Sequence, residues 1–219
     1  PEYFTLYQQV KPRIENLFNS EIHLVQAYRK KPDFGDMDVM VLNNEKLGNV
    51  MDKLKAEFKP QQIVTSGAGI YSFDINNFQI DVIAGFNKFD WNVAKDFYDY
   101  DPSGMIIGST CHSFNLKYGA GGLYYVYRSK CTNFIKEISL SKDTKEIFDF
   151  LNYDYNRYKQ GFDTLEEIFD FCISSKYFSS HKFDEDDMNR HNRKRNAKRK
   201  TFNAFVDYIK DNNITKTTE

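Results

Sequence analysis

The chain has 219 residues, of which 41% are hydrophobic and 28% are charged, and its formal net charge is −1. This is an ordinary composition for a globular protein with a core of its own. The near-zero charge excludes a uniformly basic surface, so any basic patch has to be local. No apolar run reaches the roughly 18 residues of a membrane span, and the three widely spaced cysteines indicate free thiols. We therefore expect a cytoplasmic monomer that does not cross a membrane.

Hydrophobic periodicity predicts an alternation of helices and strands. Apolar residues recur at helical spacing in residues 3–18, 44–58, 91–100, 105–119, 143–151 and 163–173, and a last helix is expected over residues 188–212. Strands are expected at residues 22–28, 38–42, 62–75, 78–85, 123–128 and 133–140. Asn76 and Asn77 form the turn between the third and fourth of these strands. The prediction is an α+β core over residues 1–138, followed by a small helical region over residues 139–219.

Two carboxylates one residue apart mark the start of the second expected strand. Asp36 and Asp38 stand in the sequence GDMDVMVL, and strand residues two apart point to the same face. Two like charges at close range cost free energy unless a cation lies between them. One interpretation is a surface turn that Asp36 caps, with Asp38 in solvent. The other is a metal site.

A third carboxylate favours the metal site. Asp81 stands in FQIDVIAG, where apolar residues occupy nearly every other position. A lone carboxylate is costly inside such a strand without a partner. If this strand lies beside the one that carries Asp36 and Asp38, three carboxylates converge. Such hard oxygen ligands suit magnesium, and two such ions about 3.5–4 Å apart can promote an in-line phosphoryl displacement.

With these motifs the chain resembles the polymerase-beta-type nucleotidyltransferase superfamily, and it is closest to the family X DNA polymerases. The likeness covers residues 20–130, and it rests on YRKKPDFGDMDVMV and QIDVIAG. It implies a palm-like catalytic domain, in which a mixed sheet is flanked by helices, over residues 1–138. It further implies that Asp36 and Asp38 bridge two Mg²⁺ or Mn²⁺ ions. Asp81 would complete the ligand set and help to activate the attacking hydroxyl.

The resemblance also implies a set of nucleotide-binding residues. Arg29 falls on the position of a triphosphate-binding arginine, and Gly35 on that of a glycine that permits close approach. MIIGSTCHSFNLKYGAGG resembles the family's nucleotide-contacting turn and helix, with Gly108 and Ser109 at the turn and Lys117 where an arginine often sits.

The chain departs from the family where the pattern has Gly-Ser, because it has Val25 and Gln26 there. The Gln26 amide can still donate a hydrogen bond, but Val25 cannot replace a close-approach glycine. Lys30 and Lys31 are candidates to supply the charge that steadies the phosphates.

A basic segment lies near the end of the chain. Residues 188–200, MNRHNRKRNAKRK, hold seven lysines and arginines and no acid. The functional interpretation is a helix that packs by its apolar C-terminal half and binds nucleic-acid phosphates with its basic half. The candidate residues are Arg190, Arg193, Arg195, Lys198 and Arg199. The alternative is a solvated charge run that the acidic residues 184–187 neutralise.

The expected function is metal-dependent transfer of a nucleoside monophosphate from a nucleoside triphosphate to a nucleic-acid 3′-hydroxyl, as in a small family X-like DNA polymerase. Two alternatives stay open, one within the nucleotidyltransferase class and one outside it. One is a nucleotidyltransferase that acts on a tRNA end or a small molecule. The other is a non-catalytic nucleic-acid-binding module on the same fold, which the Val25–Gln26 departure favours.

Overall fold

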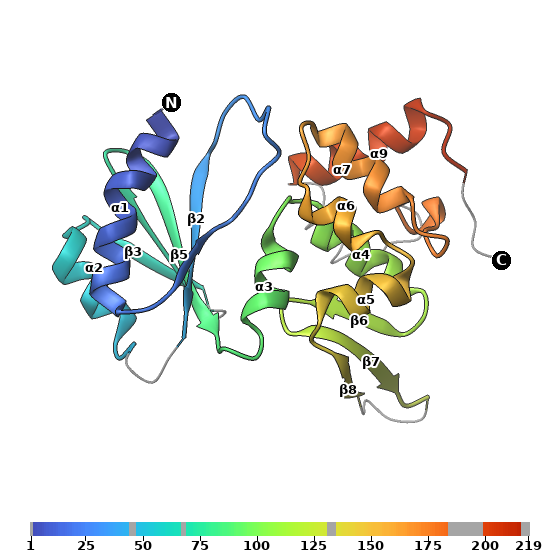
Figure 1. The fold of residues 1–219 in the computed structure, drawn as a ribbon, viewed down its shortest axis with the longest axis horizontal. Coiled ribbons are helices and arrows are strands. Elements are labelled where there is room, and N and C mark those ends of the chain that lie inside the picture. The colour runs from blue at the N-terminus through green and yellow to red at the C-terminus, as the bar shows by residue number, and fades with distance from the viewer. Residues whose placement is uncertain (1, 44–46, 67–68, 131–134, 184–198, 216–219) are drawn as a thin grey trace. The chain divides into compact units, whose positions relative to one another are not determined.

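The computed structural model describes residues 2–43, 47–66, 69–130, 135–183 and 199–215. It is an α+β structure, as expected (Figure 1). The chain forms two compact units. Unit 1 comprises Pro1–Gln26 and Pro32–Lys95, and unit 2 comprises Ala27–Lys31 and Asp96–Glu219. No helix among the described residues is long and apolar enough to span a membrane.

Unit 1 is built on a five-stranded mixed sheet. Its strands are β1 (Ile22–Leu24), β2 (Asp36–Leu42), β3 (Ile63–Ser66), β4 (Ile70–Ile75) and β5 (Phe78–Phe86). Their order is β1-β2-β5-β4-β3; β2 and β5 are parallel, and the other neighbours are antiparallel. Asn76 and Asn77 both have positive φ, 52° and 63°, which is the geometry of the two-residue hairpin turn predicted between β4 and β5.

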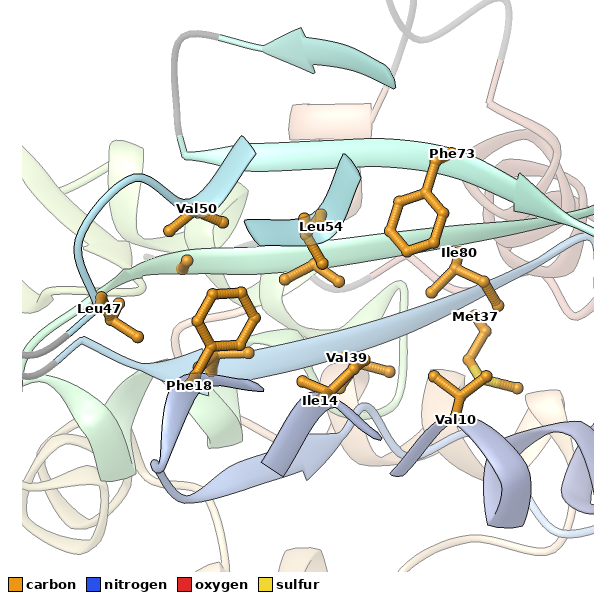
Figure 2. Packing of buried hydrophobic residues seen from close by; sticks show 13 residues of the cluster. Val10, Ile14, Phe18, Met37, Val39, Leu47, Val50, Leu54, Phe73 and Ile80 are labelled. Atoms are coloured by element: carbon orange, nitrogen blue, oxygen red, sulfur yellow. The ribbon is translucent and has the colours of Figure 1, made fainter. Parts of the chain in front are cut away.

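Two helices bury one face of this sheet. They are α1 (Glu2–Phe18) and α2 (Val50–Phe58), and α2 begins after Asn49, whose side chain accepts a hydrogen bond from the Asp52 amide. Helical spacing places Val10, Ile14 and Phe18 on the inward side of α1. Figure 2 shows them meeting the apolar side chains of α2, β2, β4 and β5. The residues of β2 and β5 that enter this core are Met37, Val39, Val41, Ile80, Val82 and Ala84.

Unit 2 has a small antiparallel sheet and most of the remaining helices. The sheet has the order β6 (Leu116–Gly119), β7 (Gly122–Arg128) and β8 (Ile135–Ser141). The helices among its described residues are α4 (Ser103–His112), α5 (Thr144–Leu151), α6 (Tyr155–Lys159), α7 (Leu165–Ile173), η1 (Ser180–Phe183) and α9 (Lys200–Asp211). Helix α3 (Trp91–Tyr98) contains the division between the units at Lys95.

Aromatic side chains dominate the core of unit 2. Phe148 of α5 lies within 5.1–6.2 Å of the rings of Tyr118, Tyr158 and Phe171. Phe205 of α9 is fully buried and packs on Phe169 of α7, with 5.1 Å between ring centroids. Side chains cap the starts of two of these helices, because Asp143 accepts from the Glu146 amide at the start of α5 and Thr164 accepts from the Glu167 amide at the start of α7.

Several boundaries differ from the sequence prediction. The strand expected over residues 62–75 is two antiparallel strands, β3 and β4, and the helix expected over 105–119 ends at His112, after which β6 begins. Asn115 takes a left-handed conformation (φ 56°), which ends the helical path and lets the chain reverse. The units also do not divide near residue 138, because that residue lies within β8, which is hydrogen-bonded to β7 in unit 2.

Candidate metal site and its surroundings

Asp38 lies directly opposite Asp81 on the parallel strands β2 and β5. Asp36 is opposite Gln79 in the same ladder. Residues opposite each other on neighbouring strands, and residues two apart on one strand, share a face of the sheet. The alternate positions, including Met37 and Val39, enter the core under α1 and α2. The three aspartates therefore share the other face, on strands about 4.8 Å apart.

Burial differs among these three carboxylates. Asp36 is exposed at the first position of β2, whereas Asp38 and Asp81 are half-buried. The side-chain amide of Gln79 donates to Asp81 Oδ1 over 2.9 Å, which fixes one oxygen of this carboxylate. Farther along the same face Met40 and Ile83 are buried, so the polar positions that β2 and β5 contribute to this face lie in the first half of each strand.

An aromatic pair borders the carboxylates. Tyr3 of α1 stacks on Phe34, with ring centroids 3.9 Å apart and an angle of 14° between the planes. Burial, and then the negative charges of Asp38 and Asp36, raise the pKa of the Tyr3 phenol. The Tyr3 phenol is thus close enough for the charges of both carboxylates to act on it. The stacking of its ring on Phe34 holds the chain just before β2. Sequence reasoning missed Tyr3, since its position near the start of a helix gives no signal for such a contact.

The donor set fits a hard divalent cation, although it does not form a closed cage. Among the residues that the structure describes, no three His, Cys, Asp or Glu side chains are grouped closely enough to hold an ion by themselves. Magnesium is usually bound by one or two carboxylates together with waters and substrate phosphates rather than by an all-protein cage. Asp36, Asp38 and Asp81 place carboxylates on one patch of the sheet, and carboxylate oxygens are ligands of that kind.

Gln26 and Gly35, which were expected to contact nucleotide, lie in unit 1 with these carboxylates. The side-chain amide of Gln26 donates to the backbone carbonyl of Leu24 over 2.7 Å, and the Val25 amide donates to the Asp38 carbonyl over 3.0 Å. Gly35 is exposed, and a Cβ built on it would meet no heavy atom within 4 Å. Nothing in the described chain therefore requires glycine at that position.

Arg29 and Lys30, expected to bind phosphates, belong to unit 2. The Arg29 guanidinium is ion-paired with Asp163, and its Nη1 donates to the Gln160 carbonyl over 2.9 Å. The backbone amides of Arg29 and Lys30 donate to the carbonyls of Phe162 and Asp163, both over 2.9 Å. The segment is thus held on the α6–α7 loop, and a triphosphate at Arg29 would compete with Asp163. Sequence reasoning missed Asp163 because it lies 134 positions from Arg29.

Gly108, Ser109 and Lys117 also lie in unit 2, and the expected turn at Gly108 and Ser109 is wrong. Both residues lie inside α4, where Ser109 Oγ donates to the Met105 carbonyl over 3.0 Å. A Cβ at Gly108 would come within 3.3 Å of the Tyr118 carbonyl oxygen, so the glycine serves close packing of α4 on β6. Lys117 is ion-paired with Glu137 of β8 over 2.9 Å.

Four of the five basic candidates for nucleic-acid binding, Arg190, Arg193, Arg195 and Lys198, lie outside the described residues. Arg199 is exposed and has an extended backbone, φ −97° and ψ 103°, just before α9. The expected helix over 188–212 therefore does not continue through Arg199. The apolar half of that prediction is confirmed, since Phe202, Phe205 and Ile209 of α9 are buried.

No protein-family model and no curated protein matches this chain.

Proposed function

We propose that the chain is a metal-dependent nucleotidyltransferase that moves a nucleoside monophosphate from a nucleoside triphosphate to a nucleic-acid 3′-hydroxyl, as a small family X-like DNA polymerase does. The observation that carries this proposal is the placement of Asp38 opposite Asp81, with Asp36 on the same face. Carboxylates gathered on one sheet face are ligands that Mg²⁺ accepts together with waters and substrate phosphates, and phosphoryl transfer uses ions held in this way.

In this proposal Asp36 and Asp38 share one role, and Asp81 has a second. When bound, two Mg²⁺ or Mn²⁺ ions would neutralise charge on the attacking and leaving oxygens of an in-line displacement. Asp36 and Asp38 would hold these ions. Asp81, one oxygen of which accepts a hydrogen bond from Gln79, would be a ligand to one ion and would help to take the proton of the acceptor hydroxyl.

The experiment is incorporation of labelled nucleoside triphosphates with Mg²⁺ or Mn²⁺ on gapped DNA, single-stranded DNA and tRNA. Incorporation that follows the template base on gapped DNA, absent from Asp38→Ala, is the expected result. Untemplated addition to one acceptor would instead indicate a terminal or tRNA-directed enzyme. If no nucleotide is incorporated on any of the three acceptors but DNA binding is retained, the chain is a non-catalytic binding module and the proposal is wrong.

A further inference from the structure

The small sheet of unit 2 carries an exposed aromatic and basic patch. Tyr125 and Tyr127 are two residues apart on β7, and their partners on β8 are Ile138 and Lys136. Residues two apart on a strand and residues opposite each other on neighbouring strands lie on the same face, so all four side chains share one face. Tyr125 is 39% exposed, Tyr127 48% and Ile138 45%, and Lys136 is exposed as well. We call these four residues the β7–β8 patch.

The patch is the outer part of a face whose inner part is buried. Leu116 and Tyr118 of β6 and Leu123 of β7 lie on the same face, and all three are buried. Tyr118 packs on Phe148 of α5, with 6.2 Å between ring centroids. The described helices therefore cover the β6 side of the face, while the tyrosines farther along β7 stay half-exposed.

Charge on this hairpin is mostly positive. Residues 122–142 contain four basic residues and one acid, whereas the whole chain has a formal charge of −1. The basic residues are Arg128, Lys130, Lys136 and Lys142. The acid is Glu137, and both of its carboxylate oxygens accept hydrogen bonds from Lys117 Nζ, over 2.9 and 3.0 Å. Because Glu137 alternates with Lys136 and Ile138 along β8, it points to the opposite face. The patch itself thus carries no acid.

We propose that the β7–β8 patch binds single-stranded nucleic acid. Exposed phenol rings on a sheet stack with bases of any sequence, and neighbouring cations bind the backbone phosphates. Tyr125 and Tyr127 are the stacking rings, and Lys136 is the phosphate ligand beside Tyr127. The inference deepens the proposed function and rests on it for the role of the bound strand, which is that of acceptor or template.

The test is fluorescence anisotropy of labelled 12-nucleotide oligo-dT and oligo-U with the full chain in EDTA. Because binding is measured without divalent metal, it does not depend on nucleotidyl transfer. Replacing either tyrosine by alanine should weaken binding about tenfold, and Tyr→Phe should keep it within about twofold. Lys136→Glu should reduce the salt dependence of the affinity.

Phe89→Ala is the matched control. Phe89 is 71% exposed in unit 1, and Lys88 lies over its ring at 5.1 Å, so it tests whether any exposed aromatic beside a lysine binds the oligonucleotide. This variant should bind like the wild type. Far-UV circular dichroism and melting temperature verify that every variant is folded.

Equal binding by the wild type, Tyr125→Ala and Tyr127→Ala, or no binding by any of them, would overturn the inference. Equilibrium sedimentation tests whether the patch binds a second copy of this chain instead. A wild-type dimer that Ile138→Lys dissociates would show such an interface and would also overturn the inference. Tyrosine-dependent binding without any incorporation would leave the inference standing and defeat the proposed function. Templated incorporation, together with oligonucleotide binding that neither tyrosine substitution weakens, would support the proposed function and overturn the inference.

Discussion

Arg29 is ion-paired with Asp163, and beside this pair the Arg29 amide donates to the Phe162 carbonyl and the Lys30 amide to the Asp163 carbonyl. The hydrogen bond from the Arg29 guanidinium holds the pKa of the Asp163 carboxyl below its ordinary value. A carboxyl with a lowered folded-state pKa contributes stability above its unfolded-state pKa, and this contribution is lost as pH falls through the folded-state value.

Replacing Arg29 should therefore change how Asp163 titrates. In Arg29→Met, the pKa of Asp163 should rise toward the ordinary aspartate value because its hydrogen-bond donor is gone. Carbon-detected NMR of the carboxyl measures this directly. Lys145→Met, which breaks the separate Lys145–Asp149 pair, is the control and should leave Asp163 unchanged. An unaltered Asp163 titration in Arg29→Met would show that the pair does not form in solution.

The thiol of Cys111 should be nearly inert in the folded protein. Burial raises its pKa to about 12, and only the thiolate reacts with disulfide reagents. At pH 8 we expect its rate with such a reagent to be at least about a thousandfold below that of the unfolded chain. Labelling is followed by mass spectrometry in a Cys131→Ser background. Because the folded-state pKa is raised, stability is lost as pH rises above the unfolded-state value. Rapid labelling of Cys111 without unfolding would contradict the buried position.

Gly122→Ala should strongly destabilise unit 2. Gly122 has φ +111°, and a Cβ there would lie 2.3 Å from the Ser141 carbonyl oxygen on the neighbouring strand. Strained backbone alone costs about 1–3 kcal/mol, and the clash adds to it. Gly119→Ala is the matched control in the same hairpin, since its Cβ would meet nothing within 4 Å. Urea unfolding should show a loss of at least about 2 kcal/mol for Gly122→Ala and little change for Gly119→Ala. Equal stability of the two variants would contradict the left-handed backbone of Gly122 and its close contact with Ser141.

Leu54→Ala should destabilise unit 1 by about 2–5 kcal/mol, because the side chain is fully buried between α2 and the sheet and its loss leaves a cavity. Val64→Ala is the control, since Val64 is 56% exposed on β3 and should change stability by less than about 0.5 kcal/mol. Urea unfolding followed by circular dichroism compares them. A smaller loss for Leu54→Ala than for the control would contradict the packing of α2 on the sheet.

Local patterns predicted much of the fold and the placement of the aspartates. Spacing by two put Asp36 and Asp38 on one face, and the apolar setting of Asp81 indicated a central strand, which is β5. These signals are local, since each depends on a few neighbouring residues. The β4–β5 turn at Asn76 and Asn77 was predictable for the same reason.

Long-range relationships were not predictable in this way. No local pattern shows that Arg29 pairs with Asp163, because the sequence DTLEE at residues 163–167 reads only as a helix start. The short strand β6 was hidden in a stretch with helical spacing that includes Leu116 and Tyr118, and its identity depends on pairing with β7. Tertiary pairing overrode local periodicity there.

We expect nucleotidyl transfer to depend on Asp38 and Asp81, and single-turnover incorporation with Mg²⁺ measures this dependence. Asp38→Asn and Asp81→Asn remove a metal-binding charge with little change of shape, and each should slow transfer by about a thousandfold or more. Asp74→Asn is the matched control, because Asp74 of β4 is exposed and pairs with Gln79 beside the same patch. It should keep transfer within about threefold of the wild type. Transfer by Asp38→Asn or Asp81→Asn at the rate of Asp74→Asn would contradict this expectation.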